Sequence, residues 1–240
     1  MSEKTNRIAK VIASAGVCSR RDAERLIADG KVQVNGKLID SPALNVSEQD
    51  LVTVNGQPIA TQTKAQVFKL YKPRGYLCTN KDPQGRATIF DLLPKNLPRL
   101  ISVGRLDFNS EGLLLLTTDN ALATKLMRPD LEIPRTYRIR IDGNLDKQQV
   151  AQIEQGLTIE GVRYRPAKIQ IEVDSKKRNS WVTLTLTEGK NREIRKIMEH
   201  FGLKVSRLIR TDYANVSLGK MQPKALLEVP FNQLKKLQEL

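Results

Sequence analysis

The chain has 240 residues, with 40 Lys and Arg against 26 Asp and Glu, one His and two Cys. That length supports one or two domains with a substantial core, and so few His and Cys argue against a His-based triad, a multi-His metal site or a disulfide scaffold. The net charge of +14 favours a polyanionic partner, with nucleic acid as the first expectation.

The first sixty residues predict two short helices followed by small antiparallel strands. Apolar residues recur at helical spacing from Ile8, and a second helix is expected to begin after Ser19, whose hydroxyl can cap it, and to end at Gly30. Asn35-Gly36 and Asn55-Gly56 each follow a short alternating segment, which is typical of a two-residue β-hairpin turn.

The start of this second helix has the chemistry of a phosphate site. Backbone N–H groups and the positive end of the helix dipole lie there, and Arg20 and Arg21 add two guanidinium groups. The alternative is that Ser19 only caps the helix and the arginines only keep it soluble. The segment GVCSRRDAERLIADGKVQVNGKLI resembles the S-four RNA-binding module, over roughly residues 4–60. This resemblance implies that Ser19, Arg20, Arg21 and Lys31 lie on the RNA side.

A polar linker at 61–64 separates this module from the rest of the chain. The net charge is +2 over residues 1–65 and +12 over residues 66–240, so most of the excess positive charge belongs to the larger part. We therefore expect an S-four-like RNA-binding domain at 1–62 and a second, larger domain at 66–240.

The larger domain is expected to be α+β with a mostly antiparallel sheet. Strand-like patterns lie at 67–71, 112–117, 136–142, 168–173 and 181–187, and helical patterns at 119–128, 146–155 and 191–201. Strands and helices do not alternate regularly, which argues against a doubly wound parallel fold. The sequence contains neither a phosphate-binding loop nor a dinucleotide fingerprint.

Two residues of the larger domain have side chains suited to chemistry. Asp107 lies in GRLDFNSEG, where it is either a turn residue or a carboxylate held in a pocket as nucleophile or base, with Arg105 placed to probe RNA. Tyr137 alternates onto one strand face with Ile139 and Ile141, so it is either a core residue or a stacking platform for a base.

The segment 190–210 is strongly basic, with seven Lys or Arg and two acidic residues. Its helical spacing predicts that Arg192 and Arg195 share a face, from which an arginine can keep a buried carboxylate ionised. A solvated helix face is the alternative interpretation. The bases of this segment that we expect to contact RNA are Lys190, Arg192, Lys196, Arg207 and Arg210.

Four segments together resemble the pseudouridine synthases that carry an N-terminal S-four module and modify ribosomal RNA. They are KPRG, GRLDFNSEGLLLLTTD, RTYRIRI and TEGKNREIRKIMEHFGLKVSRLIR, and they occur in the family's order over most of residues 68–215. The resemblance implies a nucleophile at Asp107, base stacking by Tyr137, and Arg195 as the ion-pair partner of Asp107. Ser110 stands where the family usually has Thr, a change that keeps the hydroxyl.

The same resemblance implies supporting roles around the pocket. Ile194 packs behind Tyr137, and Arg105 helps to displace the target base from its helix. Lys72 and Pro73 support the pocket wall. The implied reaction isomerises a flipped-out uridine of RNA to pseudouridine, and it requires neither a metal nor any other cofactor.

Partners and location follow from the resemblance and from the apolar pattern. We expect a monomer that binds structured ribosomal RNA, a stem-loop of 23S RNA or of a pre-ribosomal particle. A synthase acting on small-subunit 16S RNA is one alternative, and a non-catalytic RNA-binding ribosome-assembly factor is another. The longest apolar run has four residues and the N-terminus lacks the apolar core of a signal peptide, so we expect a cytoplasmic protein with no membrane partner.

Overall fold

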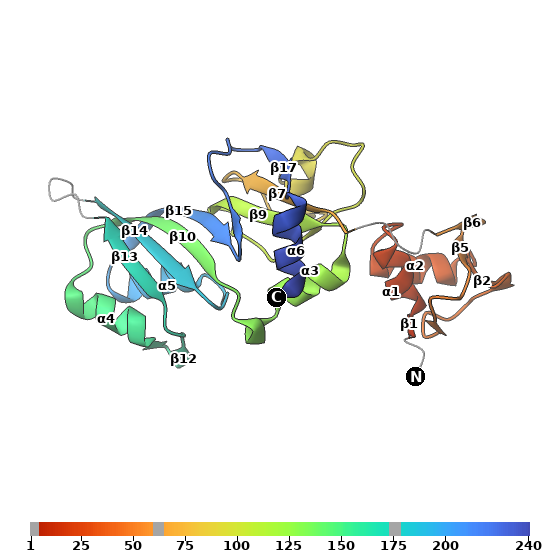
Figure 1. The fold of residues 1–240 in the computed structure, drawn as a ribbon, viewed down its shortest axis with the longest axis horizontal. Coiled ribbons are helices and arrows are strands. Elements are labelled where there is room, and N and C mark those ends of the chain that lie inside the picture. Colours follow the sequence, from red (N-terminus) through yellow and green to blue (C-terminus); the bar gives the residue numbers. More distant parts are fainter. Residues whose placement is uncertain (1–4, 60–64, 173–178) are drawn as a thin grey trace. The chain divides into compact units, whose positions relative to one another are not determined.

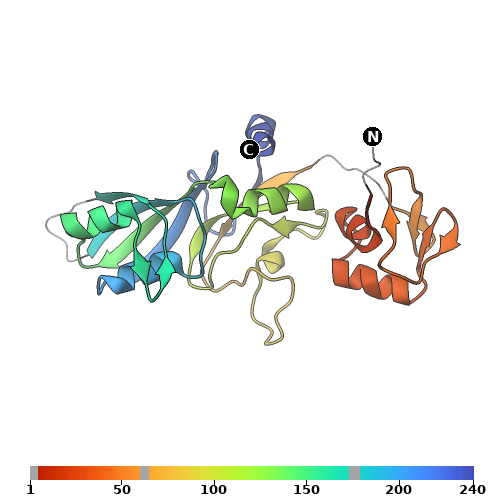
Figure 2. The same ribbon diagram turned by 90° about the horizontal axis from the view of Figure 1, so that it is seen from below.

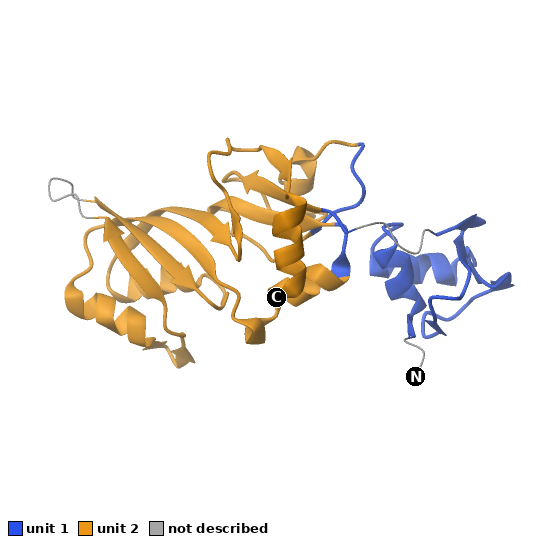
Figure 3. Ribbon diagram, in the orientation of Figure 1, with its two compact units in different colours: residues 1–66, 96–101, 118–120 blue, residues 67–95, 102–117, 121–240 orange. Residues whose placement is uncertain are grey.

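The computed structural model describes residues 5–59, 65–172 and 179–240. It divides the chain into two compact units (Figure 3). Unit 1 consists of residues 1–66, 96–101 and 118–120, and unit 2 consists of residues 67–95, 102–117 and 121–240.

Unit 1 contains two helices and short antiparallel strands, as its sequence predicts. Helices α1 (Ile8–Ser14) and α2 (Arg20–Ala28) contact each other. Two strands outside the main sheet pair with each other, β1 (Asn6–Arg7) and β4 (Asn45–Val46). A four-stranded sheet has the order β3 (Lys37–Leu38), β2 (Val32–Val34), β5 (Val52–Val54) and β6 (Gln57–Pro58).

The hairpins and core of unit 1 form where the sequence predicts them. Asn35 and Asn55 both have φ of +52°, and each precedes a Gly with positive φ, which is the backbone geometry of a type I′ turn. Ile8, Ile12 and Ile27 are fully buried in one hydrophobic cluster with the valines of the strands. This apolar cluster holds the helix pair against the small sheet.

Unit 2 is built on a mixed sheet (Figure 1). Its main strand order is β13 (Lys168–Glu172), β14 (Asn179–Leu186), β10 (Arg135–Asp142), β15 (Lys204–Tyr213), β9 (Glu111–Thr117), β7 (Val67–Lys72) and β17 (Leu226–Glu228). Strand β16 (Val216–Ser217) pairs with β15. The β9–β15 pair is parallel, whereas the other pairs along this order are antiparallel. The α+β class with a mostly antiparallel sheet is therefore confirmed.

Helices lie beside this sheet. The remaining elements are α3 (Asn120–Met127), α4 (Lys147–Gln155), α5 (Glu193–His200), α6 (Phe231–Glu239), the 3₁₀ helices η1 (Ile89–Leu92) and η2 (Pro129–Leu131), and strands β8 (Ile101–Ser102), β11 (Thr158–Ile159) and β12 (Val162–Arg163). Figures 1 and 2 show α4 and α5 beside the β13–β14–β10–β15 part, where they contact β13 and β15. Within the described ranges, no helix is long and apolar enough to cross a membrane.

Strand β9 lies in the centre of the core and approaches β15 closely. Leu113–Leu116 are fully buried, which confirms that apolar material covers both faces of this strand. Gly112 has φ of +107°, and a Cβ atom at this position would overlap the carbonyl oxygen of Arg210. A glycine is thus required where the two strands approach each other directly after the Asp107 loop.

Strand β15 was not among the predicted strands, although it occupies the middle of the sheet. Its sequence, KVSRLIRTDY, is rich in charge and lacks regular apolar alternation. The fold accommodates this because Arg210, which is 2% exposed, donates from Nε to the Leu113 carbonyl at 2.7 Å. Its guanidinium also lies over the ring of Tyr213, 5.2 Å from the ring centroid. The carbonyl partner comes from β9, about a hundred residues away in the sequence, and leaves no local signal.

Candidate active site

Unit 2 contains a cavity of about 500 Å³ at the junction of three segments. The loop that carries Asp107 forms one part of the lining, β10 and β15 form a second, and the approach to α5 forms the third. The predicted site residues that line the cavity are Arg105, Asp107, Tyr137, Lys190, Arg192, Ile194, Arg195 and Arg210. The structure therefore brings together residues that are separated by more than ninety positions in the sequence.

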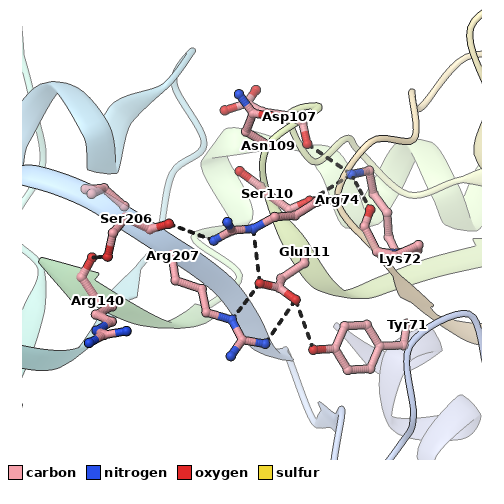
Figure 4. Close-up of polar contacts among 12 residues, drawn as sticks. Tyr71, Lys72, Arg74, Asp107, Asn109, Ser110, Glu111, Arg140, Ser206 and Arg207 are labelled. Carbon is pink, nitrogen blue, oxygen red and sulfur yellow. Dashed lines mark hydrogen bonds and ion pairs between the residues drawn. The ribbon is translucent and has the colours of Figure 1, made fainter.

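The Asp107 loop is attached to the sheet by a buried lysine. Lys72, the last residue of β7, is fully buried, and its Nζ donates to the carbonyls of Asp107 at 3.0 Å, Ser110 at 2.7 Å and Pro73 at 3.1 Å (Figure 4). Burial lowers the pKa of Lys72 to about 8, and the nearby negative charges of Asp107 and Glu111 oppose that shift. Lys72 thus lies behind the loop, outside the cavity lining, in a position consistent with the predicted supporting role.

Arg195 also holds this loop, but not through the predicted ion pair. Its Nη1 donates to the Val205 carbonyl at 3.1 Å and its Nη2 to the Asn109 carbonyl at 3.3 Å. Among the described residues, no salt bridge joins Arg195 to Asp107, and the buried Nε of Arg195 has no hydrogen-bond partner. Burial, and next the charge of Arg192, lower the pKa of Arg195, whereas Asp107 raises it. The carboxylate and the guanidinium therefore interact through space without direct contact.

Tyr137 lies on the cavity side of β10. It is buried with Ile139 and Ile141, whereas Arg138 and Arg140 are exposed on the opposite face, as the alternation predicts. Ile194, at the beginning of α5, is also buried and lines the same cavity. An aromatic ring on an apolar wall is the arrangement that a nucleobase requires for stacking.

Arg192 lies just before helix α5 and not on it, although it lines the same cavity as Arg195. Helix α5 begins at Glu193, and Arg192 precedes it in a left-handed backbone conformation with φ of +52°. Its guanidinium extends toward Glu199, with Nη2 3.8 Å from the carboxylate. The observed helix thus begins two residues after the start of the predicted 191–201 helix, because the loop conformation at Arg192 has no sequence period.

The other predicted RNA contacts have different environments. Arg207 is held by Glu111 and Lys196 is partly exposed, and neither lines the cavity. In unit 1, the Ser19 hydroxyl accepts from the Asp22 amide at 3.1 Å, so it caps α2. In that unit, Arg20 Nε lies 3.6 Å and Lys31 Nζ lies 3.4 Å from the oxygen of a neighbouring carboxylate, and both basic side chains are solvent-exposed. The third exposed base is Arg21. Such surface pairs contribute little to stability, so these bases keep donors for a ligand.

Ser110 places a hydroxyl on the cavity wall. The residue is 1% exposed, and its Oγ has no hydrogen-bond partner among the described residues. Its backbone N–H donates to the Asp107 carbonyl at 3.0 Å, which closes the turn that follows Asp107. A buried hydroxyl without a partner is suited to a ligand polar group that enters the cavity.

A pair of buried acids that the sequence does not predict also lines the cavity. Glu188 accepts the Arg165 amide at 2.8 Å and forms an ion pair with the ammonium of Lys190. Glu193 is 3% exposed and accepts the Lys190 amide at 2.9 Å. Burial, and next the negative charge of Glu188, raise the pKa of Glu193 to about 7.

Burial opposes ionisation of Glu188 as well, but hydrogen bonds from Lys190 and Arg165 lower its pKa overall. The two acids therefore have opposite pKa shifts, and both bind the loop that leads into α5. Two acids five positions apart carry no sequence signature. Within the described ranges, no group of three or more His, Cys, Asp or Glu side chains is arranged to hold a metal ion.

Known proteins share both the sequence and the fold of this chain. A family profile described as RNA pseudouridylate synthase matches residues 66–200, and an S4 domain profile matches residues 6–52. The chain is 39% identical over 236 residues to ribosomal large subunit pseudouridine synthase B of Bacillus subtilis, covering 98% of this chain and 96% of that protein. It is 47% identical over 223 residues to an RNA pseudouridine synthase of Rickettsia bellii, covering 93% of this chain and 96% of that protein.

A crystal structure of pseudouridylate synthase superimposes with a TM-score of 0.70 at 26% identity. The match covers 96% of this chain and 99% of that chain. The likeness thus extends over both the segment matched by the S4 profile and the segment that contains the cavity.

Replacing Lys72 by Met is expected to loosen the Asp107 loop. Three carbonyl groups would lose their shared donor, so we expect the free energy of unfolding to fall by about 2 kcal/mol and the amides of 107–110 to exchange hydrogen faster. The measurements are urea unfolding and amide hydrogen exchange. Lys69→Met on the same strand, where the lysine donates only to the Ser217 carbonyl, is the matched control. Equal effects of the two substitutions would contradict this role.

Replacing Glu193 by Gln is expected to change the pH dependence of stability. Because the folded pKa is raised from 4.5 to about 7, the folded state of the wild-type protein binds the extra proton, and its stability falls as pH rises through that window. The free energy of unfolding of Glu193→Gln relative to wild type should thus increase across this range, by on the order of 2 kcal/mol. Urea unfolding at a series of pH values measures it, and a difference independent of pH would contradict the prediction.

Proposed function

The chain belongs to the RNA pseudouridine synthases, isomerases that carry here an N-terminal S4 RNA-binding domain, and from this premise we propose that it converts a specific uridine of large-subunit ribosomal RNA to pseudouridine. The observation that supports the site is that Asp107 and Tyr137 line the same cavity. Similarity over nearly the whole chain to a large subunit synthase of Bacillus subtilis supports the choice of RNA. The alternative substrate is a uridine of small-subunit ribosomal RNA.

We assign the reaction to the carboxylate of Asp107. Isomerisation breaks the bond between C1′ of the ribose and N1 of uracil, turns the base, and joins C5 to C1′. The proton that leaves C5 is balanced by a proton gained at N1, so the product is an isomer and no redox equivalent is consumed. Asp107 either adds to C1′ as a nucleophile or acts on the ribose with another group, for which Tyr137 is the candidate.

The other cavity residues support this chemistry in defined ways. Because a stacked uracil cannot reach Asp107, the base must leave the RNA helix, and exposed Arg105 on the same loop is placed to occupy the vacated space. Tyr137 and Ile194 offer the flipped base a mostly apolar wall. Lys190 and Arg192 at the approach to α5 add positive charge for the RNA backbone.

The unit 1 residues supply further RNA contacts in this proposal. We propose the division 1–62 for the RNA-binding domain and 66–240 for the catalytic domain. Arg20, Arg21 and Lys31 are exposed and suited to phosphate contacts. The enzyme would act as a monomer on a structured stem-loop in the cytoplasm, where ribosomal RNA is assembled.

Replacing Asp107 by Asn is expected to abolish isomerisation while leaving RNA binding within about threefold of wild type, because the shape is kept and only the charge is lost. The measurement is a pseudouridine map of ribosomal RNA from cells that lack the gene and carry either the wild-type or the variant copy. We expect one large-subunit pseudouridine to be absent with the variant and present with the wild type. Asp146→Asn, where Asn can still cap α4, is the matched control.

The same maps separate the alternatives. Loss of a pseudouridine from small-subunit RNA alone would favour that substrate. An unchanged map in cells that lack the gene would favour the non-catalytic assembly factor. Full modification in cells carrying Asp107→Asn would contradict the assignment of the catalytic residue.

A further inference from the structure

Glu111 holds two arginines next to the Asp107 loop. Glu111 is the first residue of β9 and is 7% exposed. The Arg207 guanidinium donates to both of its carboxylate oxygens, from Nε at 2.7 Å and from Nη2 at 3.2 Å. The Nε of Arg74 lies 3.3 Å from the same carboxylate, and the Tyr71 hydroxyl donates to it at 3.3 Å (Figure 4). One buried carboxylate therefore positions two cations.

These two guanidinium groups retain donors for a ligand. Their side chains are 43% exposed for Arg74 and 45% exposed for Arg207. Arg74 also donates from Nη2 to the Ser206 carbonyl at 2.8 Å, so two of its three nitrogens are used. The Nη1 atoms of both arginines make no hydrogen bond with a described residue. Each group thus keeps an outward edge for an anion.

The surrounding charge favours an anion at this position. Arg74 and Arg195 donate to the adjacent carbonyls of Ser206 and Val205. The charge of Arg74 contributes, after burial and Arg192, to lowering the pKa of Arg195. Such close positive charges repel one another, and Glu111 neutralises only one of them. A phosphate would relieve this repulsion.

The position of this arginine pair distinguishes it from the base pocket. Neither Arg74 nor Arg207 lines the cavity, although Arg74 lies between the Asp107 loop and Glu111 (Figure 4). A ligand group held here would therefore lie beside the nucleotide whose base occupies the cavity. Backbone phosphate meets that requirement, because it is the anionic group that each neighbouring nucleotide supplies.

We propose that Arg74 and Arg207, held in place by Glu111, bind an RNA backbone phosphate beside the flipped uridine. This inference rests on the proposed function, because it takes RNA as the ligand. Arg207 is a predicted RNA contact from the sequence, whereas the sequence pattern predicts no role for Arg74 or Glu111. Glu111 is a positioning residue, since it fixes two long side chains whose ordering would otherwise oppose binding.

The test measures RNA affinity at a series of KCl concentrations for wild type, Arg74→Gln and Arg207→Gln. The probe is a ribosomal RNA fragment in which the wild-type protein forms pseudouridine. Each variant is expected to bind about tenfold more weakly at low salt. The slope of log affinity against log salt should also fall by about 0.7 to 0.9 for each lost contact. Arg163→Gln is the matched control, because this exposed arginine is held by the Gly156 and Gln155 carbonyls in the β11–β12 hairpin.

Glu111→Gln separates positioning from simple charge. Removal of an acid would tighten RNA binding if only net charge mattered, because the surface becomes more positive. Positioning predicts the opposite, weaker binding, since Arg74 and Arg207 lose their shared acceptor. Thermal unfolding of each variant shows whether the fold is kept. If Glu111→Gln fails to fold, the two variants of the half-exposed arginines still test the phosphate site.

The outcomes distinguish this inference from the function on which it rests. Wild-type affinity and salt slope in both Arg74→Gln and Arg207→Gln, with a wild-type protein that forms pseudouridine, would overturn the phosphate site alone. Failure of the wild-type protein to form pseudouridine in any ribosomal RNA fragment would instead contradict the proposed function. Tighter RNA binding by Glu111→Gln would overturn the positioning role.

Discussion

The buried ammonium of Lys72 is the interaction on which the site depends. Burying a charge away from water raises the free energy of the folded state unless polar groups surround the charge. Here three backbone carbonyls surround the ammonium. Two of these carbonyls belong to Asp107 and Ser110, at the two ends of the turn that carries the carboxylate. The strand β7 is thereby joined to the loop before β9, and the position of Asp107 is set by the sheet.

A second cation, which comes from α5, completes this support. Arg195 donates to the Asn109 carbonyl, so the short turn after Asp107 is bound by one cation from β7 and by another from α5. Asp107 raises the pKa of both Lys72 and Arg195 against the effect of burial. The carboxylate thus lies in positive surroundings, while no described residue forms a salt bridge with its oxygens. In the proposed reaction, the carboxylate that acts on the ribose benefits from such freedom.

The features that could be predicted from sequence are those with local patterns. Asn-Gly turns, the Ser19 cap, the buried Leu113–Leu116 run and the alternation around Tyr137 each depend on neighbouring residues, and each is present in the structure. Asp107 has no such pattern, and only its place in a motif and a family resemblance indicated a catalytic role.

The features that were missed depend on contacts between distant segments. Strand β15 carries charge that is satisfied by β9, so no apolar period marks it. Arg195 contacts carbonyls in place of the expected carboxylate, and the raised pKa of Glu193 arises from burial and Glu188. Such contacts form only when distant segments pack together, so they leave no local pattern in a single sequence.

The most direct test of the central claim is a crystal structure of the Asp107→Asn protein bound to a ribosomal RNA stem-loop that contains its target uridine. We predict that the uracil lies outside the RNA stack, within the cavity and against Tyr137, with its ribose facing residue 107. A uracil that remains stacked in the RNA, or that binds outside this cavity, would contradict the claim that Asp107 is the reacting group.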